Sequence, residues 1–238
     1  MSSYPTSPAY SFPVTRRLEF ATQILAGRDG TEQRWMTHAG RESWDLAYPR
    51  MGLAERDTLL SFFDASLGAG AEGIGFTLLG AAFTGCYFAG DTLSFTESDP
   101  TYYAGVVKLA QVVRAPDAGA VPSNFPLLAN GCPMQRPYTH AHVWDTAAVQ
   151  TEGGRYVRSN RTIPLRTWTA GGSAITMAEA QAIWDMFRFC RGRYHSFTFT
   201  DPDSGTQYTN CRFGADKLEW LMPEGGHSSI RVTIAQVP

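Results

Sequence analysis

The sequence predicts a mainly β protein of the α+β class, built as two tandem β-sandwich or barrel domains that are each flanked by one α-helix. Three observations lead to this prediction: a long internal repeat, one amphipathic helix pattern in each copy, and alternating strand patterns around each helix. A chain of 238 residues with 43% apolar and 13% aromatic residues is long enough to form two small cores.

The repeat is clearest between residues 86–112 and the stretch 125 positions later. Without a gap, this shift pairs Cys86 with Cys211, Phe88 with Phe213, Asp91 with Asp216, Leu93 with Leu218, Val107 with Val232 and Leu109 with Ile234. Upstream the shift is 124 and pairs Gly30 with Gly154, Arg34 with Arg158, Trp44 with Trp168, Glu55 with Glu179, Phe63 with Phe187 and Gly68 with Gly192. A unit of roughly 100 residues is too long for a solenoid repeat, so we expect an internal duplication in which each copy has its own core.

The first copy begins after a Ser-, Tyr- and Pro-rich arm at residues 1–14, which we expect to lie extended over a surface or to reach a neighbour. Strand patterns follow at 16–24 and 31–48. A helix follows at 54–68, with apolar residues at helical spacing, and its counterpart covers 178–192.

The helix ends have matching signals in the two copies. Thr176 and Glu179 form a capping box, for which Gly52 and Glu55 are the weaker equivalent. Gly68 and Gly192 each follow the last turn of a helix, where a left-handed conformation is common.

Alternating strands resume after each helix. In the second copy a hairpin is expected around the turn at 201–205, and the first copy shortens this turn to about 79–82. The Pro-rich stretch at 114–139 predicts a linker that crosses the surface. The predicted organisation is therefore an arm at 1–14, a first domain at 15–113, a linker at 114–139 and a second domain at 140–238.

The charge and the motifs argue against most ligand classes. A net charge of -2 gives no basic face for nucleic acid or anionic lipid, and we expect neither a signal peptide nor a membrane span. The four cysteines suit reduced, mostly buried thiols. Neither a nucleophile elbow nor a phosphate-binding loop is present, so we expect no enzyme and no cofactor.

Four features have alternative functional interpretations. His140 and His142 form an H-x-H pair that could donate two metal ligands, with Asp145 nearby in sequence, yet a third ligand at a telling spacing is missing. The stretch 201–205 faintly resembles a calcium loop but has the Pro and Gly positions of a tight turn, and Cys132 has no basic neighbour that would activate it. Five tryptophans could stack on sugars, although we expect them in the core: Trp35, Trp44, Trp168, Trp184 and Trp220.

The first copy also resembles a known family. The stretch GTEQR, formed by Gly30 to Arg34, precedes a strand ending at Ala47 and Tyr48 and a helix with paired aromatic residues. This order is similar to that of the distal tail proteins of long-tailed bacteriophages and gene transfer agents. The resemblance covers about residues 12–75, and the second copy keeps only Gly154 and Arg158 of the motif.

The resemblance implies domains of the tail-tube type, a β-sandwich with one flanking helix, and a structural role in the virion tail after synthesis in the host bacterial cytoplasm. The protein would form a ring that joins the tail tube to hub or baseplate proteins, either as a trimer with pseudo-sixfold symmetry or as a hexamer, and DNA would only pass through its channel. The motif residues are candidates for contacts between subunits: Gly30, Glu32, Gln33 and Arg34. The alternative is a carbohydrate-binding or cell-wall-active tail module.

The repeat also predicts which residues form the core of each copy. They are Trp44, Phe63, Cys86, Phe88 and Leu93 in the first copy and Trp168, Phe187, Cys211, Phe213 and Leu218 in the second.

Overall fold

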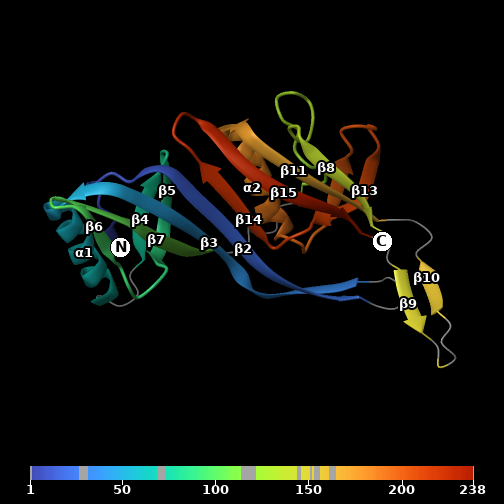
Figure 1. The fold of residues 1–238 in the computed structure, drawn as a ribbon, viewed down its shortest axis with the longest axis horizontal. Coiled ribbons are helices and arrows are strands. Elements are labelled where there is room, and N and C mark those ends of the chain that lie inside the picture. The colour runs from blue at the N-terminus through green and yellow to red at the C-terminus, as the bar shows by residue number, and fades with distance from the viewer. Residues whose placement is uncertain are drawn as a thin grey trace.

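The computed structural model describes residues 2–26, 32–68, 73–113, 122–143, 146–150, 152, 156–160 and 165–237. Over these residues the protein is mainly β, with fifteen strands and two helices. It is elongated, with α1 near one end and the hairpin of β9 and β10 at the other (Figure 1). The order of strands and helices divides the chain into an N-terminal half, residues 2–113, and a C-terminal half, residues 122–237.

The two halves contain similar series of elements. The N-terminal half consists of β1 (Ser2–Ser3), β2 (Ser11–Ala26), β3 (Glu32–Gly52), α1 (Leu53–Gly68), β4 (Ile74–Leu78), β5 (Ala81–Phe88), β6 (Phe95–Asp99) and β7 (Tyr102–Val113). The C-terminal half consists of β8 (Tyr138–Val143), β9 (Thr146–Gln150), β10 (Tyr156–Asn160), β11 (Leu165–Thr176), α2 (Met177–Cys190), β12 (Phe197–Thr200), β13 (Gln207–Phe213), β14 (Lys217–Met222) and β15 (His227–Gln236). In each half, four strands follow the helix.

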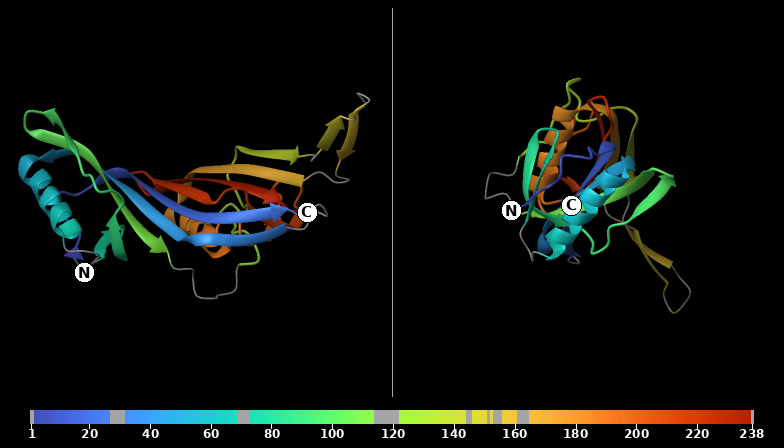
Figure 2. Two further views of the ribbon diagram at one scale, coloured as in Figure 1. Left: turned by 90° about the horizontal axis from the view of Figure 1, so that it is seen from below. Right: turned by 90° about the vertical axis from the view of Figure 1, so that its left-hand side faces the viewer.

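Thirteen of the described strands form one mixed sheet that runs through both halves. Its main path is β1-β4-β5-β7-β3-β2-β14-β15-β11-β8, while β6 pairs with β7 and β13 pairs with β12 and β15. Figure 2 shows that β2 and β3 extend along the molecule from the end that carries α1 towards the C-terminal half. Because β2 is long enough to pair with β14, the buried residues form one contiguous cluster rather than the two separate cores that the sequence predicted.

Corresponding strands pair in the same register in the two halves. In the N-terminal half Trp44 lies opposite Leu109 between β3 and β7, and Phe88 lies opposite Leu109 between β5 and β7. In the C-terminal half the counterparts are Trp168 opposite Ile234 and Phe213 opposite Ile234. Two further N-terminal pairs have C-terminal counterparts. Ala26 opposite Glu32 corresponds to Gln150 opposite Tyr156, and Phe95 opposite Gly105 corresponds to Trp220 opposite Ile230. Every residue of the second set lies 124 or 125 positions after its counterpart.

The helices begin with the caps that the sequence indicates. The Thr176 hydroxyl accepts a hydrogen bond from the Glu179 backbone N–H, and the Glu179 carboxylate accepts one from the Thr176 N–H. At the start of α1 the Gly52 N–H donates to the Glu55 carboxylate at 2.8 Å. The structure buries Trp44, Phe63, Cys86, Trp168, Phe187, Cys211, Phe213 and Leu218, and it half-buries Phe88 and Leu93 against the same cluster.

The N-terminal arm packs onto the N-terminal half. Strand β1 pairs in parallel with β4, and the Tyr4 hydroxyl lies 2.9 Å from the Tyr48 hydroxyl. Burial raises the pKa of both phenols, that of Tyr48 to about 12. The ring of Tyr4 contacts Phe62 and Phe76 edge to face, so the arm closes one end of the sheet.

The described part of the predicted linker, residues 122–139, does more than cross the surface. Phe125, Leu128 and Met134 are buried in the common cluster. The Phe125 N–H donates to the Thr198 carbonyl at 2.9 Å, next to an isolated bridge between Asn124 and Thr198. Its prolines prevent a long strand, while these three side chains still point inward, so the segment adds to the common cluster.

The loop after α2 contains a glycine in close contact with a carboxylate. Gly192 has a φ of 63°, and a Cβ added there would lie 2.6 Å from an Asp216 carboxylate oxygen. Gly205 has a φ of 67° and no atom within 4 Å of such a Cβ. Both glycines adopt the left-handed region, but only Gly192 is confined by a neighbour.

Gly205→Ala should cost about 1 kcal/mol, from the left-handed backbone alone. Gly192→Ala should cost about 1 to 3 kcal/mol more, because the methyl group must also displace Asp216. Urea denaturation of the two variants, followed by tryptophan fluorescence, measures this difference. Equal costs for the two variants would show that the contact with Asp216 has no energetic weight.

Candidate assembly interface

The two halves join edge to edge where β2 pairs with β14, and we call this pairing the seam. The antiparallel register runs from Val14 opposite Met222 to Glu19 opposite Lys217. On the inner face every second residue is buried: Val14, Arg16, Leu18, Leu218, Trp220 and Met222. The seam therefore combines a backbone ladder with a continuous buried surface.

Ion pairs line the outer face of the seam. Arg17 lies 2.9 Å from Glu219 and 2.5 Å from Asp45, and Lys217 lies 3.2 Å from Glu19. The carboxylate of Glu219 and both members of the lysine pair are roughly half exposed. Exposed pairs of this kind contribute about 0 to 1 kcal/mol each, so the apolar inner face contributes most of the stability.

Arg16 is the one buried cation on the inner face of the described seam, and Glu42 of β3 pairs with it. Its guanidinium also lies 4.4 Å from the centre of the Trp184 ring and 5.4 Å from that of Trp220. Burial raises the pKa of Glu42, and the nearby charge of Arg16 offsets this effect only in part. The pair therefore connects β2 and β3 of one half to α2 and β14 of the other.

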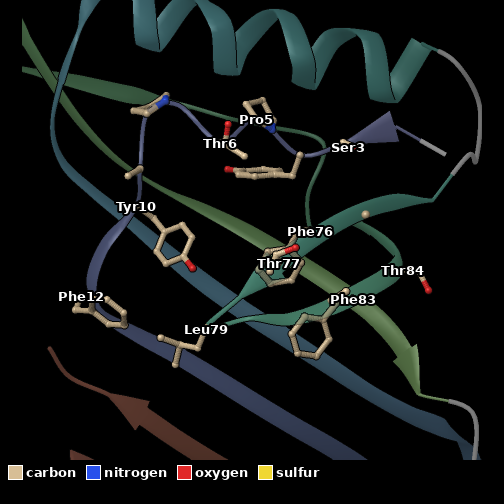
Figure 3. Close-up of a pocket in the computed structure, with 15 residues that line it drawn as sticks. Ser3, Pro5, Thr6, Tyr10, Phe12, Phe76, Thr77, Leu79, Phe83 and Thr84 are labelled. Carbon is tan, nitrogen blue, oxygen red and sulfur yellow. The ribbon is translucent and has the colours of Figure 1, made fainter. Parts of the chain in front are cut away.

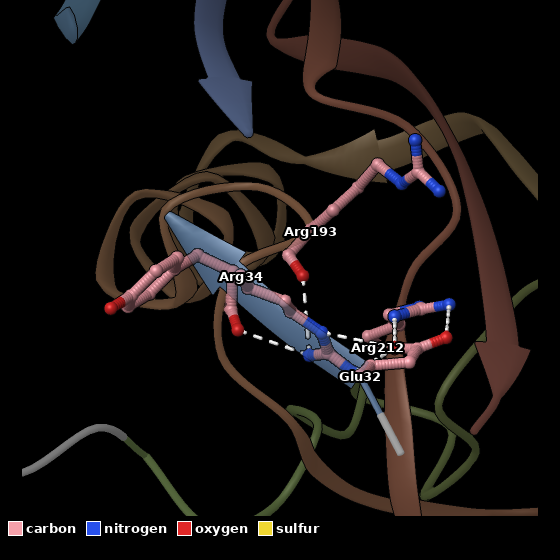
Figure 4. A network of polar contacts seen from close by, with 5 residues as sticks. Glu32, Arg34, Arg193 and Arg212 are labelled. Atoms are coloured by element: carbon pink, nitrogen blue, oxygen red, sulfur yellow. Dashed lines mark hydrogen bonds and ion pairs between the residues drawn. The ribbon is translucent and has the colours of Figure 1, made fainter. Parts of the chain in front are cut away.

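A second polar cluster fastens the far end of β3 to the C-terminal half (Figure 4). Glu32 accepts hydrogen bonds from Arg34 at 2.7 Å and from Arg212 of β13 at 3.0 Å. Arg34 also donates to the backbone carbonyl of Tyr194 at 3.1 Å. Burial acts to raise the pKa of Glu32, but the hydrogen bonds and charges of Arg212 and Arg34 outweigh it and lower that pKa below its usual value.

Asp216 ties β2 to the turn before β14. Its carboxylate accepts hydrogen bonds from the backbone N–H and the hydroxyl of Thr22, both at 3.0 Å. It also accepts the Arg193 N–H at 2.9 Å. In addition, the Phe20 N–H donates to the Asp216 carbonyl at 2.8 Å, so both side-chain and backbone atoms of one residue secure this part of the seam.

The structure places the four motif residues differently. Glu32 and Arg34 lie together in the cluster with Arg212, Gln33 is exposed, and Gly30 lies outside the described residues. Glu32 and Arg34 thus bind the other half of the same chain. Sequence reasoning did not find Arg212 or the role of Asp216, although the match of Asp91 with Asp216 was a signal for the latter.

The candidate metal and calcium residues do not form a complete site. The ring of His140 stacks on Trp168 with centroids 5.2 Å apart, and its Nδ1 lies 3.8 Å from an Asp201 oxygen. In the part of the chain that the structure describes, no group of three or more His, Cys, Asp or Glu residues could hold a metal ion. Asp145 lies outside that part. Residues 201–205 form the turn between β12 and β13, where the Gly205 N–H donates to the Asp201 carbonyl at 2.9 Å.

The aromatic residues offer little surface for stacking on sugars. Four of the five tryptophans expected in the core are at most 1% exposed, namely Trp44, Trp168, Trp184 and Trp220, but Trp35 is 44% exposed, so that prediction is wrong for Trp35. A groove between the arm and the β4–β5 hairpin is lined by Tyr10, Phe12, Phe76 and Phe83 among other residues (Figure 3). Its lining includes hydroxyl groups but no His, Cys or charged side chain. The groove thus offers aromatic and hydroxyl groups without a charged side chain, and the exposed Trp35 does not line it.

The cysteines and helices have no evident role in binding. Cys86, Cys190 and Cys211 are buried thiols, and burial raises the pKa of each to about 12, while Cys132 is half-buried. Neither described helix is long and apolar enough to span a membrane.

The sequence matches no family model, and the search of curated proteins finds no significantly similar sequence.

Replacing Arg16 alone tests the buried pair. Arg16→Met should destabilise the protein by about 3 to 5 kcal/mol, because it leaves the Glu42 carboxyl buried without its partner. The double variant Arg16→Met/Glu42→Leu removes both groups and should cost clearly less than the single change. Urea denaturation measures both values. A double variant that is less stable than the single variant would contradict this view of the pair.

Acidification tests the Glu32 cluster. Because folding lowers the pKa of Glu32, its contribution is present above the unfolded value of 4.5 and is lost as the pH falls through the folded value. Glu32→Gln should therefore be less stable than the wild type at pH 7 by about 1 to 3 kcal/mol, and this difference should shrink towards pH 3. Denaturation midpoints of both proteins between pH 7 and pH 3 measure this pH dependence, with the exposed Glu224→Gln as the control. A stability difference that does not vary with pH would contradict the assigned role of the Glu32 carboxylate.

Proposed function

We propose that this protein is a non-enzymatic structural component of a phage tail tip or baseplate, and that it forms a ring around the tail channel. The ring connects the tail tube to hub or baseplate proteins, and DNA only passes through it. It consists of three chains with pseudo-sixfold symmetry or of six chains. The seam supports this proposal most directly, because it joins two similar halves edge to edge.

The matching registers support the view that the halves are copies of one duplicated, tail-tube-like domain. A one-residue slip would turn every side chain to the opposite face of the sheet, so register is a strict property of a strand pair. The pairs Trp44 with Leu109 and Trp168 with Ile234 occupy equivalent places in sequence and in the sheet. Their agreement with the element order favours one ancestral domain that was copied.

The way in which the halves meet favours a ring. A sheet edge that pairs with a different edge of its neighbour is a head-to-tail contact, and such contacts repeat into a closed ring if the rotation between neighbours closes and into an open filament if it does not. In this chain β2 of the N-terminal half pairs with β14 of the C-terminal half. It does not pair with β8, the C-terminal strand that corresponds to β2. Two neighbouring domains of a ring are thus already present in one chain.

The positions of Glu32 and Arg34 add to the proposal. In the family that the GTEQR stretch resembles, this motif belongs to ring-forming subunits. Here Glu32 and Arg34 contact Arg212 and the Tyr194 carbonyl of the neighbouring half. The burial of four tryptophans gives the alternative, a carbohydrate-binding module, no comparable support.

Electron microscopy of the purified protein tests the proposal. We expect closed rings with a central channel, and native mass spectrometry should give a mass of three or six chains. Fusing a large soluble protein to residue 238 should leave the folding and the number of chains in the ring unchanged. The fused protein then marks the position of each subunit in the images. Monomers alone at every protein concentration, or open filaments alone, would contradict the proposal.

A further inference from the structure

Several described strands pair on one side only, and two of them, β6 in the N-terminal half and β8 in the C-terminal half, have edges that lie far apart in the molecule (Figure 1). Strand β6 pairs only with β7, and strand β8 pairs only with β11. Figure 1 shows β6 beside α1 and β8 at the far side of the C-terminal half, so one chain cannot join the two edges. An edge strand has a row of unpaired backbone N–H and C=O groups, so it readily pairs with another strand.

These two edges correspond to the strands that form the seam. His140 lies opposite Trp168 between β8 and β11, as Arg16 lies opposite Trp44 between β2 and β3. Likewise β6 meets β7 in the register in which β14 meets β15. Hence β8 is equivalent to β2, and β6 with the residues before it is equivalent to β14.

We propose that the β8 edge of one copy of this chain pairs antiparallel with the β6 edge of the next copy, in the register of the seam. The expected opposite residues are Tyr138 with Glu97, Thr139 with Thr96, His140 with Phe95, Ala141 with Ser94 and His142 with Leu93. This contact gives the ring proposed above its interface between chains, and it rests on that function.

The side chains of the two edges are compatible in this register. On the inner face His140 meets Phe95 and His142 meets Leu93, and both Phe95 and Leu93 are half-buried against the common cluster. On the outer face small side chains meet, so no pair brings like charges together. Strand β8 contains no Lys, Arg, Asp or Glu, which are the residues that commonly protect an edge from pairing.

The helix α1 is less covered than α2 in the place where this contact would lie. Trp184 of α2 is fully buried and packs on Arg16 of β2, whereas its counterpart in α1, Leu60, is only half-buried. Arg16 also lies 3.4 Å from the Gln181 amide oxygen, and Asp57 is the counterpart of Gln181. In the pairing proposed here β8 covers Leu60, and His140 faces the Asp57 carboxylate.

A repeated aspartate indicates the same contact. At the seam the Asp216 carboxylate accepts two hydrogen bonds from Thr22. Asp91 corresponds to Asp216 and is exposed. In the proposed ring the Asp91 carboxylate of one copy can accept hydrogen bonds from the next copy, as that of Asp216 does at the seam.

Disulfide cross-linking of the full chain tests the register. In a Cys132→Ser background, Thr139→Cys/Thr96→Cys places two thiols opposite each other across the contact, at a separation that a disulfide can bridge. Mild oxidation should link chains on the order of tenfold faster than in the control Thr139→Cys/Thr92→Cys, whose thiols would lie about 13 Å out of register. Equal rates for the two variants, or no link between chains, would overturn the proposed contact.

A charge test gives an independent answer. Ser94→Glu/Ala141→Arg places at the contact an ion pair equivalent to that of Glu219 and Arg17 at the seam, and rings should persist. Ser94→Glu/Ala141→Glu places two carboxylates opposite each other and should abolish rings. Both positions are exposed, so circular dichroism should show the same fold for the two variants. Rings that persist in the second variant would overturn the contact.

The outcomes separate this contact from the proposed function. Closed rings without register-specific cross-links would overturn the contact and leave the ring function standing. Register-specific cross-links in filaments or open chains, with no closed ring, would support the contact and overturn the ring function. Register-specific cross-links within closed rings support both.

Discussion

The backbone pairing between β2 and β14 is the interaction on which the arrangement of the two halves depends. Without it β2 would be an edge strand of the N-terminal half, and its inner face would lose the contacts of Arg16 and Phe20 with α2. With it β2 becomes an interior strand between β3 and β14. The buried apolar residues Val14, Leu18 and Leu218 then complete one cluster, and each such side chain contributes about 1.5 to 3 kcal/mol on full burial.

Polar groups at the seam set its register more than its strength. The Arg16–Glu42 pair is buried, and removing two charges from water offsets much of what their attraction supplies. A slip of one residue between β2 and β14 would nevertheless turn the inner face of one strand outward, and with β2 held by β3 it would take Trp220 away from Arg16 and Trp184. The Glu32 cluster and Asp216 restrict the other positions along β2 and β3. We infer that these groups select one alignment of an interface that apolar burial stabilises.

Local patterns in the sequence predicted the local structure well. The two helices, the capping box at Thr176 and the turn after residue 200 all follow from short-range spacing. The joining of the halves could not be predicted in this way, since Glu32 and Arg212 are 180 positions apart and neither has a repeated equivalent that would indicate its partner. Tyr156 and Tyr87 occupy the equivalent positions. Composition likewise marked residues 114–139 as a linker but did not indicate that Phe125 and Met134 enter the core.

Covalent linkage of the halves would give the seam an advantage over the contact proposed between chains. Strand β14 is always near β2 of its own chain, so the internal contact forms at a high effective concentration and leaves β14 closed to β8 of another chain. Strand β6 has no such internal partner among the described residues. The outer face of the seam also has ion pairs at Arg17 and Glu19, whereas the residues 124 positions later are Ala141 and Val143. If the chains pair as proposed, the two contacts would share a geometry but differ in surface, and this difference would direct β8 to β6 in head-to-tail addition around the axis.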